Sequence, residues 1–261
     1  MAAVARVYKK ITYEQPLNEK MRTFLRLELL FLQVQHNLEG DSEWNSRAML
    51  TSLIEILNVC SRTDFKTELL RELERHGAML ARLEQVPEVD QDRLRELLSE
   101  VDTLIDRLHA TSGQFGQSLR SNDFICSIRQ RSSIPGGLCD FDLPMYHYWL
   151  QRPAKERLDD VRQWLSPIDP MWLSIELILR LTRESAAATA EVAVAGFFQR
   201  SLDQNITCQL VCVTVPARLL YYPEISGSKH RFTVRFLAPV TDGRTVQSVD
   251  DVKFWLTCCM S

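Results

Sequence analysis

Apolar residues recur every three or four positions up to about residue 188, and this spacing predicts helices. Residues 42–60, for example, place Met49, Leu53 and Leu57 on one helical face. Two longer apolar stripes follow, joined by a short link at Pro87. Because the link is short, the two stripes predict an antiparallel helical hairpin.

Polar residues suited to helix capping stand where several of these helices are predicted to begin. Thr63 precedes the first helix of the hairpin, and Asp90 precedes the second. Asn122 or Ser121 precedes a shorter helix, and Asp169 precedes an apolar helix that we expect to run through the core.

Beyond residue 188 the period of the pattern changes to two, which predicts strands. The strand candidates are residues 192–198, 206–215, 230–237 and 252–257. The predicted fold is α+β, with a multi-helix domain that contains the long hairpin at residues 13–188 and a small antiparallel β-sheet domain at residues 189–261. Residues 5–12 also look extended, so a strand within residues 4–12 is a candidate to join this sheet.

The segment at residues 13–32, YEQPLNEKMRTFLRLELLFL, places basic residues on an otherwise apolar helix. Pro16 suits a first helical turn, where its missing N–H is not needed, and Glu19 suits the helix dipole there. Only two charged residues interrupt the apolar run that follows, so most of this helix is predicted to be buried. Glu19 can reach Arg22, whereas Arg26 has no acid three or four positions away. An internal ion pair, a solvated edge and an external anion all remain open for Arg26.

The segment at residues 230–236, HRFTVRF, alternates apolar and polar residues, so Arg231 and Arg235 share one face of a predicted strand. Lys229 lies just upstream. A solvated sheet face is the alternative to a binding surface. Arginine suits the capture of a carboxylate because its planar fork can bond both oxygens.

Two further candidates flank a glycine turn, IPGG at residues 134–137. Arg129 adds positive charge before the turn, although a cation near a helix C-terminus can simply satisfy the helix dipole. His147 lies among aromatic residues in DLPMYHYWL, which also suits a core histidine. Its block joins the glycine turn, which makes His147 a candidate binding residue.

Composition narrows the possible functions. The chain has 261 residues and a formal net charge of −3, which argues against general nucleic-acid binding. It contains no run of 18 apolar residues, so we expect no membrane span. No export signal is visible, and the 7 cysteines lack the spacing of a disulfide scaffold, so we expect a cytoplasmic protein.

The sequence predicts neither a metal site nor catalysis. Cys208 and Cys212 share a strand face but lie roughly 13 Å apart in an extended strand, too far for one tetrahedral zinc. Cys258 and Cys259 point to opposite faces of a strand. No nucleophile elbow, phosphate-binding glycine loop or zinc-protease motif occurs. We therefore expect no metal, no cofactor and no enzymatic activity.

Several blocks of the sequence resemble the ZapD family of bacterial cell-division proteins. They are PLNEKMRTFLRLE, KTELLRELER, PEVDQDRL, IRQRSSIPGGLCDFDLP, YPEISGSKHRFTVRF and the final cysteine pair, and they follow the family's order along nearly the full chain. The resemblance implies a non-enzymatic partner of FtsZ, the tubulin-like GTPase of the division ring. It also implies a homodimer that cross-links and bundles FtsZ filaments at mid-cell.

The favoured hypothesis is therefore an interaction protein whose basic surface captures an acidic peptide, which the resemblance implies is the C-terminal tail of FtsZ. The predicted partner-binding residues are Arg22, Arg26, His147, Arg231, Arg235, Arg129 and Lys229. There is also a physical reason to expect a homodimer. Strands as apolar as CQLVCVTV and VKFWLTCC would expose an apolar edge or face in a monomer. The alternatives are an enzyme with a cleft centred on His147 and a nucleic-acid binder that uses the same arginines.

Overall fold

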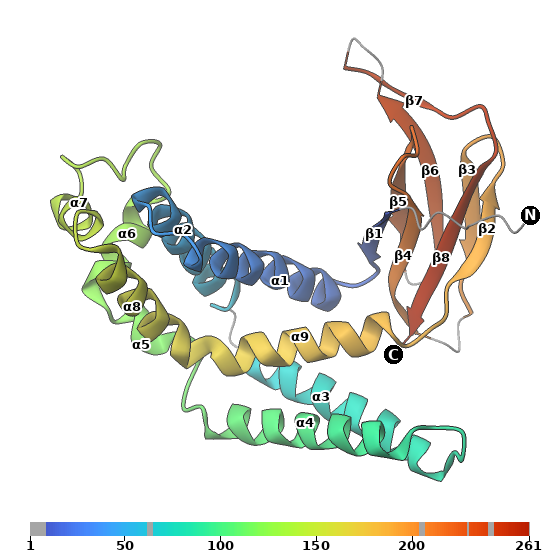
Figure 1. Cartoon of the computed structure of the whole chain (residues 1–261), viewed down its shortest axis with the longest axis horizontal. Coiled ribbons are helices and arrows are strands. Elements are labelled where there is room, and N and C mark those ends of the chain that lie inside the picture. The colour runs from blue at the N-terminus through green and yellow to red at the C-terminus, as the bar shows by residue number, and fades with distance from the viewer. Residues whose placement is uncertain (1–8, 62–64, 204–206, 229, 240–242, 261) are drawn as a thin grey trace, which may run out of the picture. The chain divides into compact units, whose positions relative to one another are not determined.

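The computed structural model describes residues 9–61, 65–203, 207–228, 230–239 and 243–260 (Figure 1). The fold is α+β, as the sequence predicts, with helices in the first part of the chain and strands in the last part. The chain divides into two units. Residues 23–179 form the helical unit, and residues 1–22 together with residues 180–261 form the strand unit.

The helical part follows the predicted order of helices. The α-helices of the described residues are α1 (Glu19–Leu38), α2 (Glu43–Val59), α3 (Phe65–Ala81), α4 (Gln91–Ala110), α5 (Gln117–Arg120), α6 (Asp123–Arg131), α7 (Pro144–Leu150), α8 (Ala154–Leu165) and α9 (Asp169–Arg183), with 3-10 turns at η1 (Arg82–Gln85) and η2 (Ser166–Ile168). Asp90 and Asn122 cap α4 and α6 as predicted, because their side-chain oxygens accept from backbone N–H groups of the first turns. Asp169 lies inside the first turn of α9 rather than before it. Thr63 lies outside the described residues.

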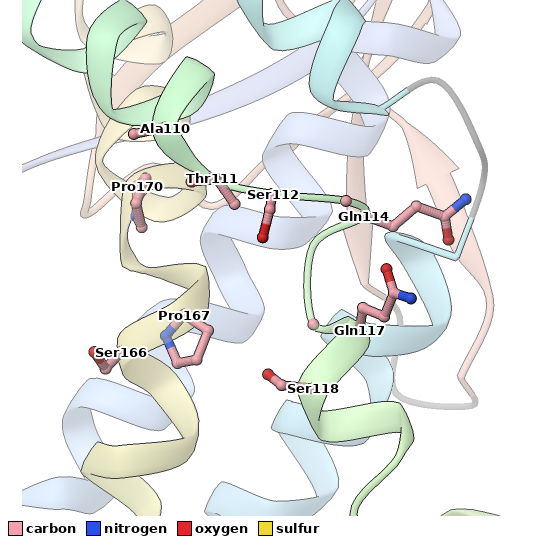
Figure 2. Close-up of a pocket in the computed structure, with 11 residues that line it drawn as sticks. Ala110, Thr111, Ser112, Gln114, Gln117, Ser118, Ser166, Pro167 and Pro170 are labelled. Atoms are coloured by element: carbon pink, nitrogen blue, oxygen red, sulfur yellow. The ribbon is translucent and has the colours of Figure 1, made fainter.

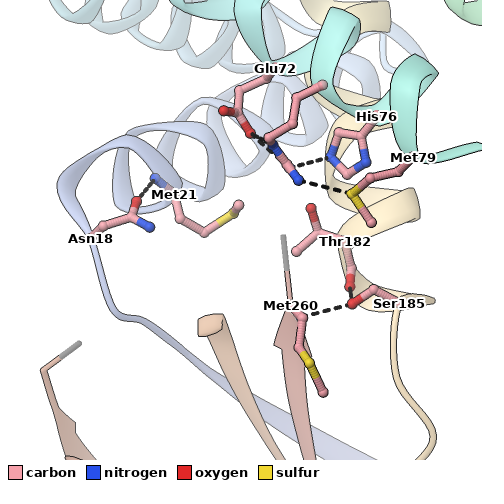
Figure 3. A network of polar contacts seen from close by, with 9 residues as sticks. Asn18, Met21, Glu72, His76, Met79, Thr182, Ser185 and Met260 are labelled. Carbon is pink, nitrogen blue, oxygen red and sulfur yellow. Dashed lines mark hydrogen bonds and ion pairs between the residues drawn. The ribbon is translucent and has the colours of Figure 1, made fainter. Parts of the chain in front are cut away.

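Helices α3 and α4 lie side by side as the predicted antiparallel hairpin (Figure 1). Leu69 and Leu73 of α3 are buried. The same helix also buries Glu72 and His76 (Figure 3). Arg75 donates to Glu72 Oε2 from Nη2 at 3.0 Å and lies 3.0 Å from His76 Nε2, so the buried carboxylate has a cation beside it.

Helix α1 begins later than the sequence predicts, so the placement of Pro16 in its first turn is wrong. Pro16 is the last residue of strand β1 (Lys10–Pro16), and Leu17 N still donates to Gln209 O at 2.9 Å. Pairing with β4 thus holds the chain extended past Pro16. Asn18 then caps the helix, because Met21 N donates to Asn18 Oδ1 at 2.8 Å (Figure 3).

The prediction that most of α1 is buried is also wrong. Met21, Phe24 and Leu27 are fully buried, but Leu29 and Leu32 are 58% and 49% exposed. The apolar run is longer than one helical face, and only the residues of one face can pack into a single core.

The strand-rich part contains two antiparallel sheets rather than one. The remaining strands are β2 (Thr189–Ala193), β3 (Phe197–Ser201), β4 (Cys208–Pro216), β5 (Tyr222–Gly227), β6 (Arg231–Pro239), β7 (Thr245–Gln247) and β8 (Val252–Met260). One sheet has the order β1-β4-β8-β2, and the other has the order β3-β6-β5 with β7 also paired to β6. Phe232 and Val234 of β6, Val213 of β4 and Phe254 of β8 share one apolar core.

The N-terminal strand joins the first sheet, where Thr12 lies opposite Thr214 of β4. It covers residues 10–16, whereas residues 5–8 of the predicted strand lie outside the described part of the chain.

A turn interrupts the strand predicted at residues 192–198. Ala195 and Gly196 have φ angles of 47° and 70°, so the chain reverses there and β2 and β3 enter different sheets. A Cβ on Gly196 would lie 2.7 Å from Ser248 O, which makes glycine necessary. Strands β5 and β7 were not predicted, since β5 contains a proline and a glycine and β7 has only three residues.

Strand β4 is buried on both faces. The second face meets the end of α9, where Arg183 donates to both carboxylate oxygens of Glu14 at 2.8 Å. Cys259 of β8 lies in the same place, because its Sγ is 3.9 Å from Arg183 O and 3.8 Å from Cys212 Sγ. The helix end therefore covers the face of the first sheet that the other sheet leaves free.

Candidate functional site

Strand β6 presents the predicted arginine face. Phe232, Val234 and Phe236 are buried, while Arg231 and Arg235 are exposed on the opposite face. The strict alternation of side chains along a strand therefore produces a basic outer surface from the same residues that build the core.

The two arginines of β6 have different surroundings. Arg235 is paired with Glu224 of β5 through Nη2 and Oε1, and about half of each side chain is exposed. No described residue forms an ion pair with Arg231. Because an exposed pair is weak, Arg235 remains able to exchange Glu224 for another carboxylate.

A shallow polar pocket of about 360 Å³ opens beside Arg231. Its lining comes from three strands and a turn: Gln199, Ser226, Gly227, Ser228, Arg231, Phe232 and Thr233. Gln199 and Ser226 lie directly opposite Thr233 on either side of β6. Hydroxyl and amide groups thus surround one guanidinium, which suits the binding of a polar anionic group. Lys229, predicted for the same surface, lies outside the described residues.

Helix α1 carries the other predicted arginine pair. Arg22 Nε donates to Glu19 Oε1 at 3.2 Å, in the exposed pair that the sequence predicts. Arg26 is exposed, and no described residue forms a hydrogen bond or ion pair with its side chain. Leu29, nearly one turn further along the helix, is also exposed. The outer face of α1 is thus both cationic and apolar.

Arg129 and His147 lie on α6 and α7. Arg129 Nε donates to Asn58 Oδ1 at 2.8 Å, so this guanidinium has a neutral partner within the helical unit. His147 is exposed on α7, and it is not the core histidine that its aromatic neighbours also suggested. The neighbouring Tyr146 and Trp149 fill the core instead.

The predicted residues belong to both units. Arg22, Arg231 and Arg235 belong to the strand unit, and Arg26, Arg129 and His147 belong to the helical unit. Two of the predicted pairs share a face: Arg231 with Arg235 on β6, and Arg22 with Arg26 on α1.

Sequence reasoning missed a neutral pocket of about 680 Å³ in the helical unit (Figure 2). It lies between the link after α4 and the turn η2, and its lining includes Ser112, Gln117 and Ser118 as well as Pro167 and Pro170. No charged side chain lines it. The only sequence signal was a segment rich in Ser, Gly and Gln at residues 111–118, which is also typical of an ordinary helix link.

The cysteines form close pairs across β4 and β8 but no metal cluster. A hydrogen bond with Cys208, together with the positive charge of Arg200, lowers the pKa of the Cys258 thiol to about 7. Burial raises the pKa of Cys60 to about 12. Within the described residues, no group of three or more histidine, cysteine or acidic side chains could hold a metal ion. No helix of this part of the chain has the length and apolar character needed to cross a membrane.

Comparison with known proteins gives a consistent result. A model of the ZapD family, described as a cell division protein, matches residues 25–235. The chain is 45% identical to the cell division protein ZapD of Methylococcus capsulatus over 96% of this chain and 98% of that protein. It is 38% identical to the proteins of the same name from Coxiella burnetii and Azoarcus sp., over 95% of this chain and 97% and 99% of theirs.

Proposed function

The chain belongs to the ZapD family of cell division proteins, and from this premise we propose that it binds the acidic C-terminal tail of FtsZ. As a homodimer it would cross-link and bundle FtsZ filaments at the mid-cell division ring. It would act by binding alone, without catalysis.

The observation that carries the proposal is that the side chain of Arg26 is exposed and unpaired among the described residues. This guanidinium is exposed on α1 and has no ion-pair partner among the described residues, in a chain whose net charge is −3. The negative charge of the whole chain does not attract an acidic partner, so attraction must come from local cations. Arg26 on α1 and Arg231 on β6 are local cations of this kind.

The arginine surfaces suit a flexible acidic peptide. A guanidinium can bond both oxygens of a carboxylate, and charge-assisted bonds of this kind are about twice as strong as neutral ones. A disordered tail must be ordered as it binds, which offsets part of that gain. Binding of one tail is therefore expected to be weak, and a filament with many tails would bind a dimer much more tightly.

The surface of the strand unit supports the homodimer. Large apolar side chains are exposed on or next to strands β2, β3 and β7: Val192, Val194, Phe197, Val246 and Val249. Exposed apolar surface on neighbouring elements is typical of a protein–protein interface. None of these side chains belongs to the helical unit, which carries Arg26.

In the part of the chain that the structure describes, no site geometry supports the enzyme alternative. His147 lies exposed on α7 and lines neither the neutral pocket of the helical unit nor the pocket beside Arg231. A nucleic-acid binder would use the same arginines. The two hypotheses differ in the competitor that should displace the bound filament, which is the free tail peptide in one case and duplex DNA in the other.

Co-sedimentation with polymerised FtsZ tests the proposal. The chain should pellet with filaments of full-length FtsZ and stay in solution with filaments that lack the C-terminal tail. An excess of free tail peptide should release it, whereas duplex DNA of equal charge should not. Pelleting that does not depend on the tail would show that the tail is not the partner.

A further inference from the structure

A second basic pocket, separate from the predicted arginines, lies under the glycine turn that links α6 to α7. Its volume is about 520 Å³, and Arg47 of α2 and residues 132–139 line it. A Cβ on Gly137 would lie 2.6 Å from Arg131 O, so the tight turn that forms the wall needs glycine there. We call this cavity the Arg47 pocket.

The guanidinium of Arg47 contacts two aromatic rings. Its Cζ lies 5.3 Å from the ring centre of Trp44 and 5.3 Å from that of Tyr146. Contacts of this kind leave N–H groups of the guanidinium for hydrogen-bond acceptors. The Tyr146 hydroxyl is one such acceptor. The Nε atom is buried and has no hydrogen-bond partner within the described residues.

Among the residues that the structure describes, no carboxylate forms an ion pair with Arg47. Glu43, one turn earlier on α2, accepts from Gln151 Nε2 at 3.3 Å instead. Tyr146 offers only a neutral phenol, because burial raises the pKa of its hydroxyl to about 12. An acidic ligand would therefore meet an arginine that is already oriented and not yet neutralised.

The rim of the pocket is apolar. Trp44 is 70% exposed beside Arg47, and Ile134 is 48% exposed in the wall. The chain between the turn and the end of α7 also exposes Phe141, Met145 and Tyr148. Exposed apolar and aromatic side chains near a partly buried cation suit a peptide that offers a carboxylate next to an apolar side chain.

We propose that the Arg47 pocket binds one acidic side chain of the FtsZ tail and that an adjacent apolar side chain of the tail packs on Trp44 and Ile134. This inference rests on the function proposed above. It adds a specific subsite, formed by residues that the sequence pattern did not single out, to the cations on the surface. The surface cations attract any acidic segment, whereas the subsite selects one in which a carboxylate and an apolar group are neighbours.

The test measures how the purified full-length chain binds a synthetic peptide of the FtsZ tail. Arg47→Gln should weaken binding about tenfold or more, because it removes a charge-assisted bond. Arg93→Gln is the matched control, since Arg93 is an exposed arginine of α4 that forms an ion pair with Glu96. This control should bind the peptide as the parent chain does.

A double-mutant cycle identifies the contact itself. Each tail carboxylate is changed in turn to the corresponding amide, and each peptide is measured with the parent chain and with Arg47→Gln. For one of the amide peptides, binding to the parent chain should be about tenfold weaker than that of the unmodified peptide. The Arg47→Gln variant should bind this amide peptide and the unmodified peptide equally well. If, for every tail carboxylate, the loss of binding free energy from the amide change adds to the loss from Arg47→Gln, the proposed Arg47 contact is overturned.

A second variant distinguishes a loss of binding from a loss of folding. It is needed because Arg47 also packs on buried Tyr146, so Arg47→Gln could disturb the fold. Ile134→Glu adds a negative charge to the exposed wall and leaves the aromatic stack in place. It should weaken binding about tenfold with an unchanged melting temperature. Unchanged binding by Ile134→Glu, with Arg26→Glu still defective, would overturn the subsite and leave the proposed function standing. A parent chain that does not bind the tail peptide at all would overturn both.

Discussion

Arg26, on the outer face of α1, is a cation whose proposed role is binding rather than folding. Arg26 has no partner among the described residues and is exposed, so the folded chain gains little from it. Removing it should therefore affect a partner much more than the free energy of unfolding.

We predict that Arg26→Glu weakens binding to tail-bearing FtsZ filaments at least about tenfold and shifts the melting temperature little. Co-sedimentation and thermal unfolding measure the two effects. Arg93→Glu, the same charge reversal on α4, should leave filament binding unchanged. A large drop in melting temperature for Arg26→Glu would instead identify Arg26 as part of an internal ion pair.

Arg157 is the opposite case, a charge that serves the fold. It is buried, and its guanidinium donates to Ser46 Oγ at 3.0 Å and to the backbone oxygens of Leu150, Arg152 and Asp41 at 2.8, 2.6 and 2.6 Å. Nothing in the sequence separates Arg157 from the surface charges of α8, because the residues that it joins lie up to 116 positions away.

We predict that Arg157→Met lowers the free energy of unfolding by about 3–5 kcal/mol, since it leaves several buried oxygens unpaired. Denaturant unfolding measures the loss. Arg162→Met, on the same helix but in an exposed ion pair with Asp159, should cost less than about 1 kcal/mol. Similar values for the two variants would mean that Arg157 is not the structural link that its contacts indicate.

At the scale of elements, strand β6 carries two arginines that have equivalent positions in the sequence pattern but different surroundings in the structure. Arg235 already has Glu224 as a neighbour, while Arg231 faces a polar pocket. An incoming carboxylate must displace Glu224 at the first position but not at the second. Arg231 should therefore contribute more to binding.

We predict that Arg231→Glu weakens tail binding more than Arg235→Glu does, and that binding by the parent chain falls as salt is raised. Exposed charges are screened strongly at a Debye length of about 8 Å in physiological salt. Titrations of the tail peptide between low and high salt measure both effects. An affinity that does not change with salt concentration would indicate that the tail binds in an apolar groove and not on the arginine face.

The pairing of β4 with β8 sets up another element-scale effect, the reactivity of Cys258. Its pKa of about 7 lies below the value of 9.0 for a free thiol, so the thiolate forms as the pH rises through about 7. We predict that alkylation of Cys258 by iodoacetamide accelerates between pH 6 and 8, whereas Cys60, with a pKa of about 12, stays unmodified. Peptide mass mapping after timed labelling measures both. A single alkylation midpoint near pH 9 for Cys258 would contradict the influence of Cys208 and Arg200.

The sequence predicted elements well where a local signal decides them and poorly where distant pairing decides them. The caps at Asp90 and Asn122 and the alternation in β6 depend on neighbouring residues, and both were correct. The start of α1 depends on β4, some 190 residues away, which holds Leu17 in the extended form. The turn at Ala195 and Gly196 was not predicted because residues 192–198, VAVAGFF, contain no polar residue that would mark it.

The candidate site divides in the same way. Exposed arginines on a helix face and on a strand face follow from the periodicity, so Arg26 and Arg231 could be proposed from the sequence. The Arg47 pocket could not, because Trp44, Tyr146 and the glycine turn come from three separate elements. Only the tertiary fold brings them around one guanidinium.

At the scale of the whole molecule, the proposed cross-linking depends on two separable properties, tail capture and dimerisation. A variant that is monomeric by light scattering, such as one with Val192, Val194 and Val249 changed to aspartate, should still bind the isolated tail peptide. It should fail to bundle filaments in electron micrographs, because a monomer holds only one filament. A stable monomer that bundles as well as the parent chain would rule out this mechanism.

The strand unit is assembled from both ends of the chain, and this affects how the protein can be made. Thr12 and Thr214 face each other across β1 and β4 but are separated by 202 positions in the sequence. A ribosome needs about 10–40 s to add that many residues at about 5–20 residues per second. The first strand therefore leaves the ribosome long before its pairing partner exists, while the helices between them have time to fold. Any truncation that removes β4 would leave β1 as a free strand edge available to other chains, so shortened products of this gene should aggregate even though their helices are intact.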